Sequence, residues 1–81
     1  MEKFLNEMRA KSDEAYAKAL PMIDSYLKSA ISNAAEKGLR EAIVRFQGSD
    51  TANQAKRRCE EFGLKMSFHM RGTWATCIVN F

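Results

Sequence analysis

The chain has 81 residues, of which 46% are hydrophobic and 28% are charged. This composition is that of an ordinary globular protein and excludes a disordered chain; the length predicts one domain. The formal net charge is +3, and the whole excess lies in residues 39–81, which is far from the dense basic clusters of dedicated nucleic-acid-binding proteins. Because a domain this short buries only about 60% of its unfolded surface, we expect help from oligomerisation, a metal or disulfides.

Cys59, Cys77 and the single histidine, His69, are too few to build a zinc site. Both cysteines fall on the apolar sides of predicted elements, so we expect reduced thiols in the core in preference to a disulfide. The chain has no signal-peptide pattern and no apolar run of about 18 residues. These features predict an intracellular, cytoplasmic protein without a cofactor and without membrane contact.

Residues 2–20 are rich in Ala, Glu and Lys and predict a helix whose apolar stripe has heptad-like spacing. The stripe is weakly apolar for a core helix. We therefore expect an N-terminal helical arm, residues 1–20, that packs on a second copy or on another partner. The candidate oligomer-interface residues are Phe4, Leu5, Met8, Ala15 and Tyr16.

Pro21 disfavours a helical conformation at the residue before it and suits the first turn of a new helix. We therefore expect a second helix over 21–37, with a single helix kinked at Pro21 as the alternative. The apolar residues of 21–37 recur with the 3.6-residue period of an amphipathic helix. Gly38 then predicts a left-handed helix stop in which Leu39 folds back on Ala34.

The rest of the chain predicts a β-α-β-β succession. Residues 39–46 alternate as a strand, and Thr51 with Gln54 forms a candidate capping box at the start of a helix that Gly63 ends. Residues 64–70 and 74–81 alternate as two further strands around a tight turn at Arg71-Gly72, with a bulge.

A right-handed crossover makes the first two strands parallel. The last strand is apolar on both faces, which is typical of a central position. The fold class predicted is therefore α+β: two N-terminal helices followed by β-α-β-β, on a three-stranded antiparallel sheet of order 1-3-2. Residues 1–81 form one domain, in which 21–81 make a compact α-β-α-β-β core.

One face of this sheet packs on helices, and the other combines apolar and basic side chains. Because a patch with a tryptophan is costly to leave in water, something should cover it. The first reading is a helix of the same chain, which gives an α/β/α sandwich; the second is a symmetric oligomer interface. The third is a platform for a nucleic acid or nucleotide, with Trp74 stacking on a base. The candidate binding residues are Ile43, Arg45, Lys65, His69, Trp74 and Ile78.

No constellation in the sequence predicts catalysis. Lys56, Arg57 and Arg58 precede Glu60 and Glu61 at a spacing that allows pairing along a helix, so a solvated face is favoured over a phosphate contact. The turn 46–51 has the strand-glycine-helix order that can hold a phosphate, although a capped helix start explains it. His69 lacks an acidic residue placed to orient it. We expect a non-enzyme.

The segment Ile31-Ser32-Asn33-Ala34-Ala35-Glu36-Lys37-Gly38, the following strand, the helix ending Glu61-Phe62-Gly63-Leu64 and the terminal hairpin resemble many small bacteriophage-encoded proteins. The resemblance covers residues 31–81. It implies an accessory viral protein: a virion component, or a small binder acting on host or defence machinery in the host cytoplasm. It assigns no functional residue.

Together these features predict a non-catalytic interaction protein that self-associates and binds a host or viral protein. The alternative is a nucleic-acid or nucleotide-binding module that uses the Trp74 face and its basic residues.

Overall fold

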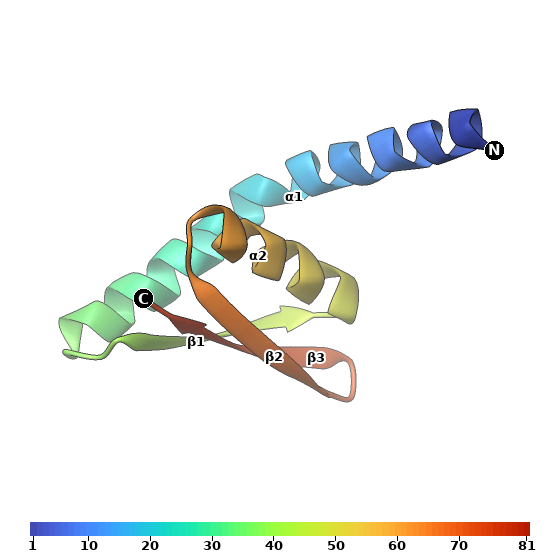
Figure 1. Ribbon diagram of the computed structural model, residues 1–81. Helices are drawn as coiled ribbons and strands as arrows, with labels where there is room; N and C mark the ends of the chain where they lie inside the picture. The colour runs from blue at the N-terminus through green and yellow to red at the C-terminus, as the bar shows by residue number, and fades with distance from the viewer.

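The computed structural model describes residues 1–81 and has two helices and one three-stranded sheet (Figure 1). The elements, in chain order, are α1 (Glu2–Glu36), β1 (Glu41–Gln47), α2 (Ser49–Glu61), β2 (Lys65–Arg71) and β3 (Trp74–Asn80). The sheet order is β1-β3-β2, and β3 is antiparallel to both neighbours. The predicted α+β class and strand order are confirmed.

The predicted division into two N-terminal helices is wrong, because α1 continues through Pro21 as a single helix. Pro21 has no backbone N–H to donate, and Figure 1 shows the helix axis bending in the part that the colour bar places near residue 20. Tyr16 and Ile23 lie two turns apart on the same side of α1, and both are buried. Because Tyr16 and Ile23 pack on the body on either side of Pro21, the helix is bent there but stays continuous.

Both helices pack on one face of the sheet, with α2 as the crossover between β1 and β2 (Figure 1). Every second residue of β1 is buried, which follows directly from the alternation of the sequence. The core gathers residues from all five elements: Ile23, Leu27, Val44, Phe46, Ala52, Ala55, Cys59, Met66, Ala75, Cys77 and Val79. Both cysteines are free and buried, as expected.

Each helix ends in a Schellman motif built around a glycine. At the end of α1, the N–H of Leu39 donates to the carbonyl of Ala34 at 2.9 Å, and Gly38 has a φ of 77°. At the end of α2, the N–H of Leu64 donates to the carbonyl of Cys59 at 2.9 Å. These pairings satisfy carbonyls that the helix leaves without a partner, and they turn the chain directly into β1 and β2.

The start of α2 differs from the prediction. Its N-cap is Gly48, and no side chain makes a capping hydrogen bond; the predicted capping box of Thr51 and Gln54 is therefore wrong. Instead, the N–H of Gly48 donates to the carbonyl of Thr73 at 2.7 Å. This bond ties the β1–α2 connection to the β2–β3 turn.

The hairpin turn consists of Gly72 and Thr73, and Arg71 pairs directly with Trp74. The predicted bulge is therefore absent. Of the two turn residues only Gly72 has a positive φ, which is the pattern of a type II′ turn. Because the register is unbroken, alternate residues of β2 and β3 stay on the same side of the sheet up to the turn.

Although α1 is long, no helix here has the apolarity needed to cross a bilayer.

Candidate functional site

The sheet face opposite the helices is open. The reading in which a helix of the same chain covers it is wrong, because α1 and α2 both lie on the other side (Figure 1). Ile43 is 62% exposed and Trp74 is 50% exposed, while Ile78 is partly buried between its neighbours. We call this surface the open face; its residues are Glu41, Ile43, Arg45, Gln47, Lys65, Ser67, His69, Arg71, Trp74, Thr76, Ile78 and Asn80.

All six predicted binding residues lie on the open face, but the strand register separates them. Ile43 pairs with Ile78 in the middle of the sheet. Arg45 and His69 lie in the next row, on either side of the central strand. Lys65 is in the row of Asn80, at the opposite end of the sheet from Trp74. The structure therefore brings Ile43, Ile78, Arg45, His69 and Trp74 together and leaves Lys65 apart.

A shallow hollow of about 300 Å³ lies on the open face beside the hairpin turn, lined by Arg45, Arg71, Trp74 and Thr76. Neither arginine has an ion-pair partner within the chain. The sequence prediction missed Arg71 because it assigned that residue to the turn. The alternation that begins at Lys65 continues through Arg71 and, with an unbroken hairpin register, places it on the open face.

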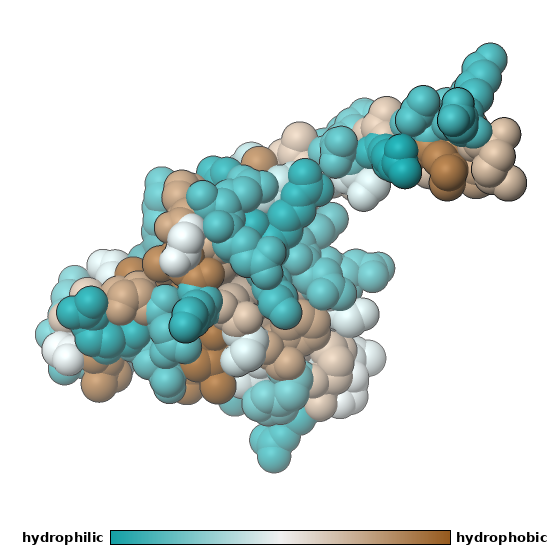
Figure 2. All heavy atoms as spheres, viewed as in Figure 1, coloured by the Kyte–Doolittle hydropathy of each residue, from teal (hydrophilic) through white to brown (hydrophobic).

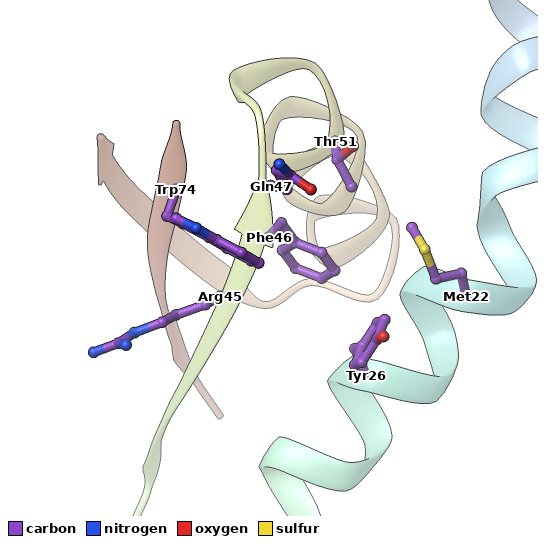
Figure 3. Close-up of a pocket in the computed structure, with 7 residues that line it drawn as sticks. All are labelled: Met22, Tyr26, Arg45, Phe46, Gln47, Thr51 and Trp74. Atoms are coloured by element: carbon purple, nitrogen blue, oxygen red, sulfur yellow. The ribbon is translucent and has the colours of Figure 1, made fainter. Parts of the chain in front are cut away.

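A second hollow, of about 560 Å³, runs along the outer edge of β1, between that strand and α1 (Figure 3). We call it the edge groove; its lining residues are Met22, Tyr26, Arg45, Phe46, Gln47, Thr51 and Trp74. The rings of Tyr26 and Phe46 meet edge to face with centroids 5.9 Å apart. In Figure 3 the Trp74 indole leans toward β1 while Arg45 points away from α1. Trp74 and Arg45 therefore line both hollows.

The first eleven residues of α1, residues 2–12, project from the body, and we call them the arm (Figures 1 and 2). Apart from the backbone hydrogen bonds of α1 itself, no hydrogen bond or ion pair joins them to the rest of the molecule. Phe4 is 55% exposed, Leu5 is exposed and Met8 is partly exposed. Figure 2 shows hydrophobic atoms gathered near the end of this projection.

Tyr16 and Ala15, the other two candidate interface residues, lie where α1 meets α2. Tyr16 is only 6% exposed; its hydroxyl donates to Oε1 of Glu61 at 2.7 Å, and the guanidinium of Arg57 covers its ring at 3.9 Å. Tyr16 therefore packs within its own chain, whereas Ala15 is exposed. Of the five candidate interface residues, Phe4, Leu5, Met8 and Ala15 are therefore available to another molecule.

The basic cluster on α2 joins the two helices. Arg58 donates two hydrogen bonds to the carboxylate of Asp24, at 2.9 and 3.0 Å, and a third to Glu61 at 3.0 Å. Arg57 pairs with Glu61 along the helix, as its spacing suggested, and also with Asp13 across to α1. Spacing within one helix does not reveal the partners on α1, so sequence reasoning missed these bridges.

These contacts shift the pKa values of the groups involved. The hydrogen bonds from Arg58 lower the pKa of Asp24, and those from Tyr16 and Arg58 lower the pKa of Glu61. Burial, followed by the bond to Glu61, raises the pKa of Tyr16. Burial also raises the pKa of Cys59 and raises that of Cys77 to about 11. The charged pairs therefore stay charged and the two thiols stay protonated near neutral pH.

His69 is exposed on the open face, and its cross-strand neighbour there is Thr76. No group of three or more His, Cys, Asp or Glu residues is placed to hold a metal ion. Comparison with models of protein families, with curated proteins and with solved structures found no match.

Proposed function

We propose that this protein is a non-catalytic interaction protein that associates with itself and binds a further protein through the arm and the open face. The observation that carries the proposal is that a chain of 81 residues leaves two separate apolar surfaces without a partner. Exposed patches of this kind mark interaction sites in soluble proteins. Both surfaces combine large apolar side chains with charged neighbours.

The arm gives this proposal its strongest support. Most of the stability of a helix in a protein comes from packing of its apolar face, and the arm extends α1 beyond the residues that pack on the body. The arm has no such packing within the chain, and its apolar residues face solvent. A partner that covers Leu5 and Met8 would supply the packing that the arm lacks.

Concentration-dependent self-association tests the proposal. Sedimentation velocity or light scattering across roughly 1–100 µM should show a dimer or larger species whose population rises with concentration. Leu5→Glu should weaken the association, whereas Ala10→Glu adds the same charge on the other side of the arm and should leave it unchanged. A monomer at every concentration overturns self-association.

The further partner is proposed to be a host or viral protein in the cytoplasm of the infected cell, in line with the resemblance to small phage proteins. Affinity capture from host lysate should be run with the wild-type chain, Leu5→Glu, Ile43→Glu and the control Ala10→Glu. A protein that is captured by wild type and Ala10→Glu, but lost with either surface variant, supports the proposal. Equal capture by all four baits excludes these surfaces as its binding site.

The second candidate function is binding of single-stranded nucleic acid, favoured by the hollow that holds Trp74 between Arg45 and Arg71. Their two guanidinium groups lack carboxylate partners, and an exposed indole beside free cations suits a stacked base and its phosphate. Titration with an oligonucleotide should quench Trp74 fluorescence, with an affinity that falls as salt rises. Arg45→Gln and Arg71→Gln should weaken binding, while Lys28→Gln on α1 should not. Absent or salt-independent quenching removes this candidate.

A further inference from the structure

The arm and the open face are two apolar surfaces of the same chain that cannot reach one another within it. We propose that they meet between two copies: in a two-fold dimer, the arm of each copy lies across the open face of the other. This inference rests on the proposed self-association and specifies its geometry. The residues in contact are Phe4, Leu5 and Met8 on the arm and Ile43, Trp74 and Ile78 on the face.

The direction of the apolar stripe on the arm shows where the partner lies. Leu5 precedes Tyr16 by eleven residues, or about three turns of helix without a proline, and Tyr16 lies on the same side of α1 as Ile23. Ile23 is fully buried toward the sheet. Leu5 therefore faces the layer of the sheet, in the space beside its own body. A partner that fills this space presents a surface to the underside of the arm.

A two-fold axis across the arm supplies that surface. It turns the second copy over, so that its sheet lies beside the first sheet and its open face meets the arm. The same operation places the second arm against the open face of the first copy, as closed two-fold symmetry requires. Each body then has helices on one side of its sheet and the partner's arm on the other.

The dimensions of the two surfaces agree. Eleven helical residues span about 16 Å, and a helix with its side chains is about 10 Å wide. Three strands of seven residues make a face about 24 Å long and 10 Å between its outer strands. One arm is therefore sufficient to cover the middle of one face, where Ile43 and Ile78 pair.

The buried area favours exchange over the simpler pairings. Pairing of two arms leaves both open faces in water, and pairing of two faces leaves both arms in water. Two reciprocal arm–face contacts cover both surfaces in each copy, so the exchange leaves neither the arm nor the open face in water.

Trp74 is the only tryptophan and reports directly on the open face. In the wild-type protein its emission should shift to the red on dilution, as the partner's arm leaves it. Leu5→Glu should produce the same red shift at high concentration and weaken the dimer roughly tenfold or more. Leu5 and Trp74 of one chain lie on opposite sides of the sheet layer, so this shift would report a contact between two chains. Ala10→Glu serves as the matched control and should keep the wild-type emission.

Cross-linking identifies which surfaces meet. Chains carrying Leu5→Cys and Ile43→Cys are mixed and treated with a short bismaleimide, and the wild-type chain controls for the buried native thiols. Exchange predicts cross-linked dimers in the mixture and none with either variant alone. Cross-linked dimers in the Leu5→Cys sample by itself would show arm–arm pairing. Cross-linked dimers in the Ile43→Cys sample by itself would show face–face pairing. Either result overturns the exchange. A protein that never dimerises overturns the proposed self-association itself.

Discussion

The hydroxyl of Tyr16 donates a 2.7 Å hydrogen bond to the carboxylate of Glu61, forty-five positions later in the chain. Tyr16 is the first buried residue of α1. The bond therefore joins the two helices at the point where the arm leaves the body. Arg57 and Arg58 extend this contact to Asp13 and Asp24.

Tyr16→Phe removes this hydrogen bond and keeps the ring. The free energy of unfolding should fall by about 1 kcal/mol, because a partly buried hydrogen bond is lost and the carboxylate of Glu61 is left without this donor. Tyr26→Phe is the matched control, since the hydroxyl of Tyr26 makes no hydrogen bond within the chain while its ring packs on Phe46. Urea denaturation followed by circular dichroism measures both. Equal effects of the two substitutions would contradict a stabilising role for the Tyr16 hydroxyl.

Stability should fall on the acid side of pH 4. In the folded state the pKa values of Asp24 and Glu61 are lowered, mainly by hydrogen bonds from Arg58 to the first and from Tyr16 to the second. The unfolded chain therefore binds protons first as the pH drops, which favours unfolding. The contribution is complete above the ordinary carboxyl values near 4 and is lost as the pH falls through the lower folded values.

Thermal unfolding measured between pH 6 and pH 2.5 checks this prediction. Asp24→Asn should lower the melting temperature at pH 6 and flatten its decline in acid. Glu60→Gln is the control, because Glu60 makes no ion pair, and its curve should follow that of the wild type. A decline as steep in Asp24→Asn as in the wild type would exclude Asp24 as a source.

Pro21→Ala should stabilise the protein, by about 1–3 kcal/mol. Alanine restores the backbone N–H that proline lacks and removes the clash with the preceding turn of α1. Ser25→Ala, at an exposed position one turn later, should change the free energy of unfolding by only a few tenths of a kcal/mol. The two variants are compared by urea denaturation. A loss of stability in Pro21→Ala would mean that the bend in α1 is needed for packing on the body.

The two thiols should be inert in the folded protein. Burial raises the pKa of Cys77 to about 11 and also raises that of Cys59, so the reactive thiolate is scarce at pH 8. A maleimide reagent followed by mass spectrometry should find almost no label in native protein and two labels per chain in denaturant. Rapid labelling of native protein would show that the core opens readily around α2 and β3.

The strands and helix ends were predictable because their signals are local. Alternation placed Val44 inside and Ile43 outside without reference to the rest of the chain, and the glycines at 38 and 63 ended both helices where expected. The central position of the last strand followed from its two apolar faces. All six candidate residues of the open face were found in this way, while Arg71 was missed by assigning it to the turn.

The features that were not predictable depend on contacts between distant segments. The local preference of Pro21 for a helix start is overridden by the burial of Tyr16 and Ile23 on either side. The bond between Asp24 and Arg58 joins residues thirty-four positions apart, which spacing within one helix does not reveal. The open face is exposed because α1 and α2 pack on the same side of the sheet. The alternation of residues in the strands does not show on which side each helix packs.

Because α1 is one continuous helix, the number of residues between the arm and the body fixes the direction in which Leu5 points. A single residue inserted between the arm and Tyr16 turns Leu5 by about 100° around the helix axis and shifts it by 1.5 Å. An insertion of seven residues restores the orientation to within about 20° but moves the stripe by about 10 Å. A flexible linker would absorb either change. This helix therefore acts as a spacer of fixed length, and insertions or deletions should weaken the proposed contacts of the arm as much as substitutions of its apolar residues.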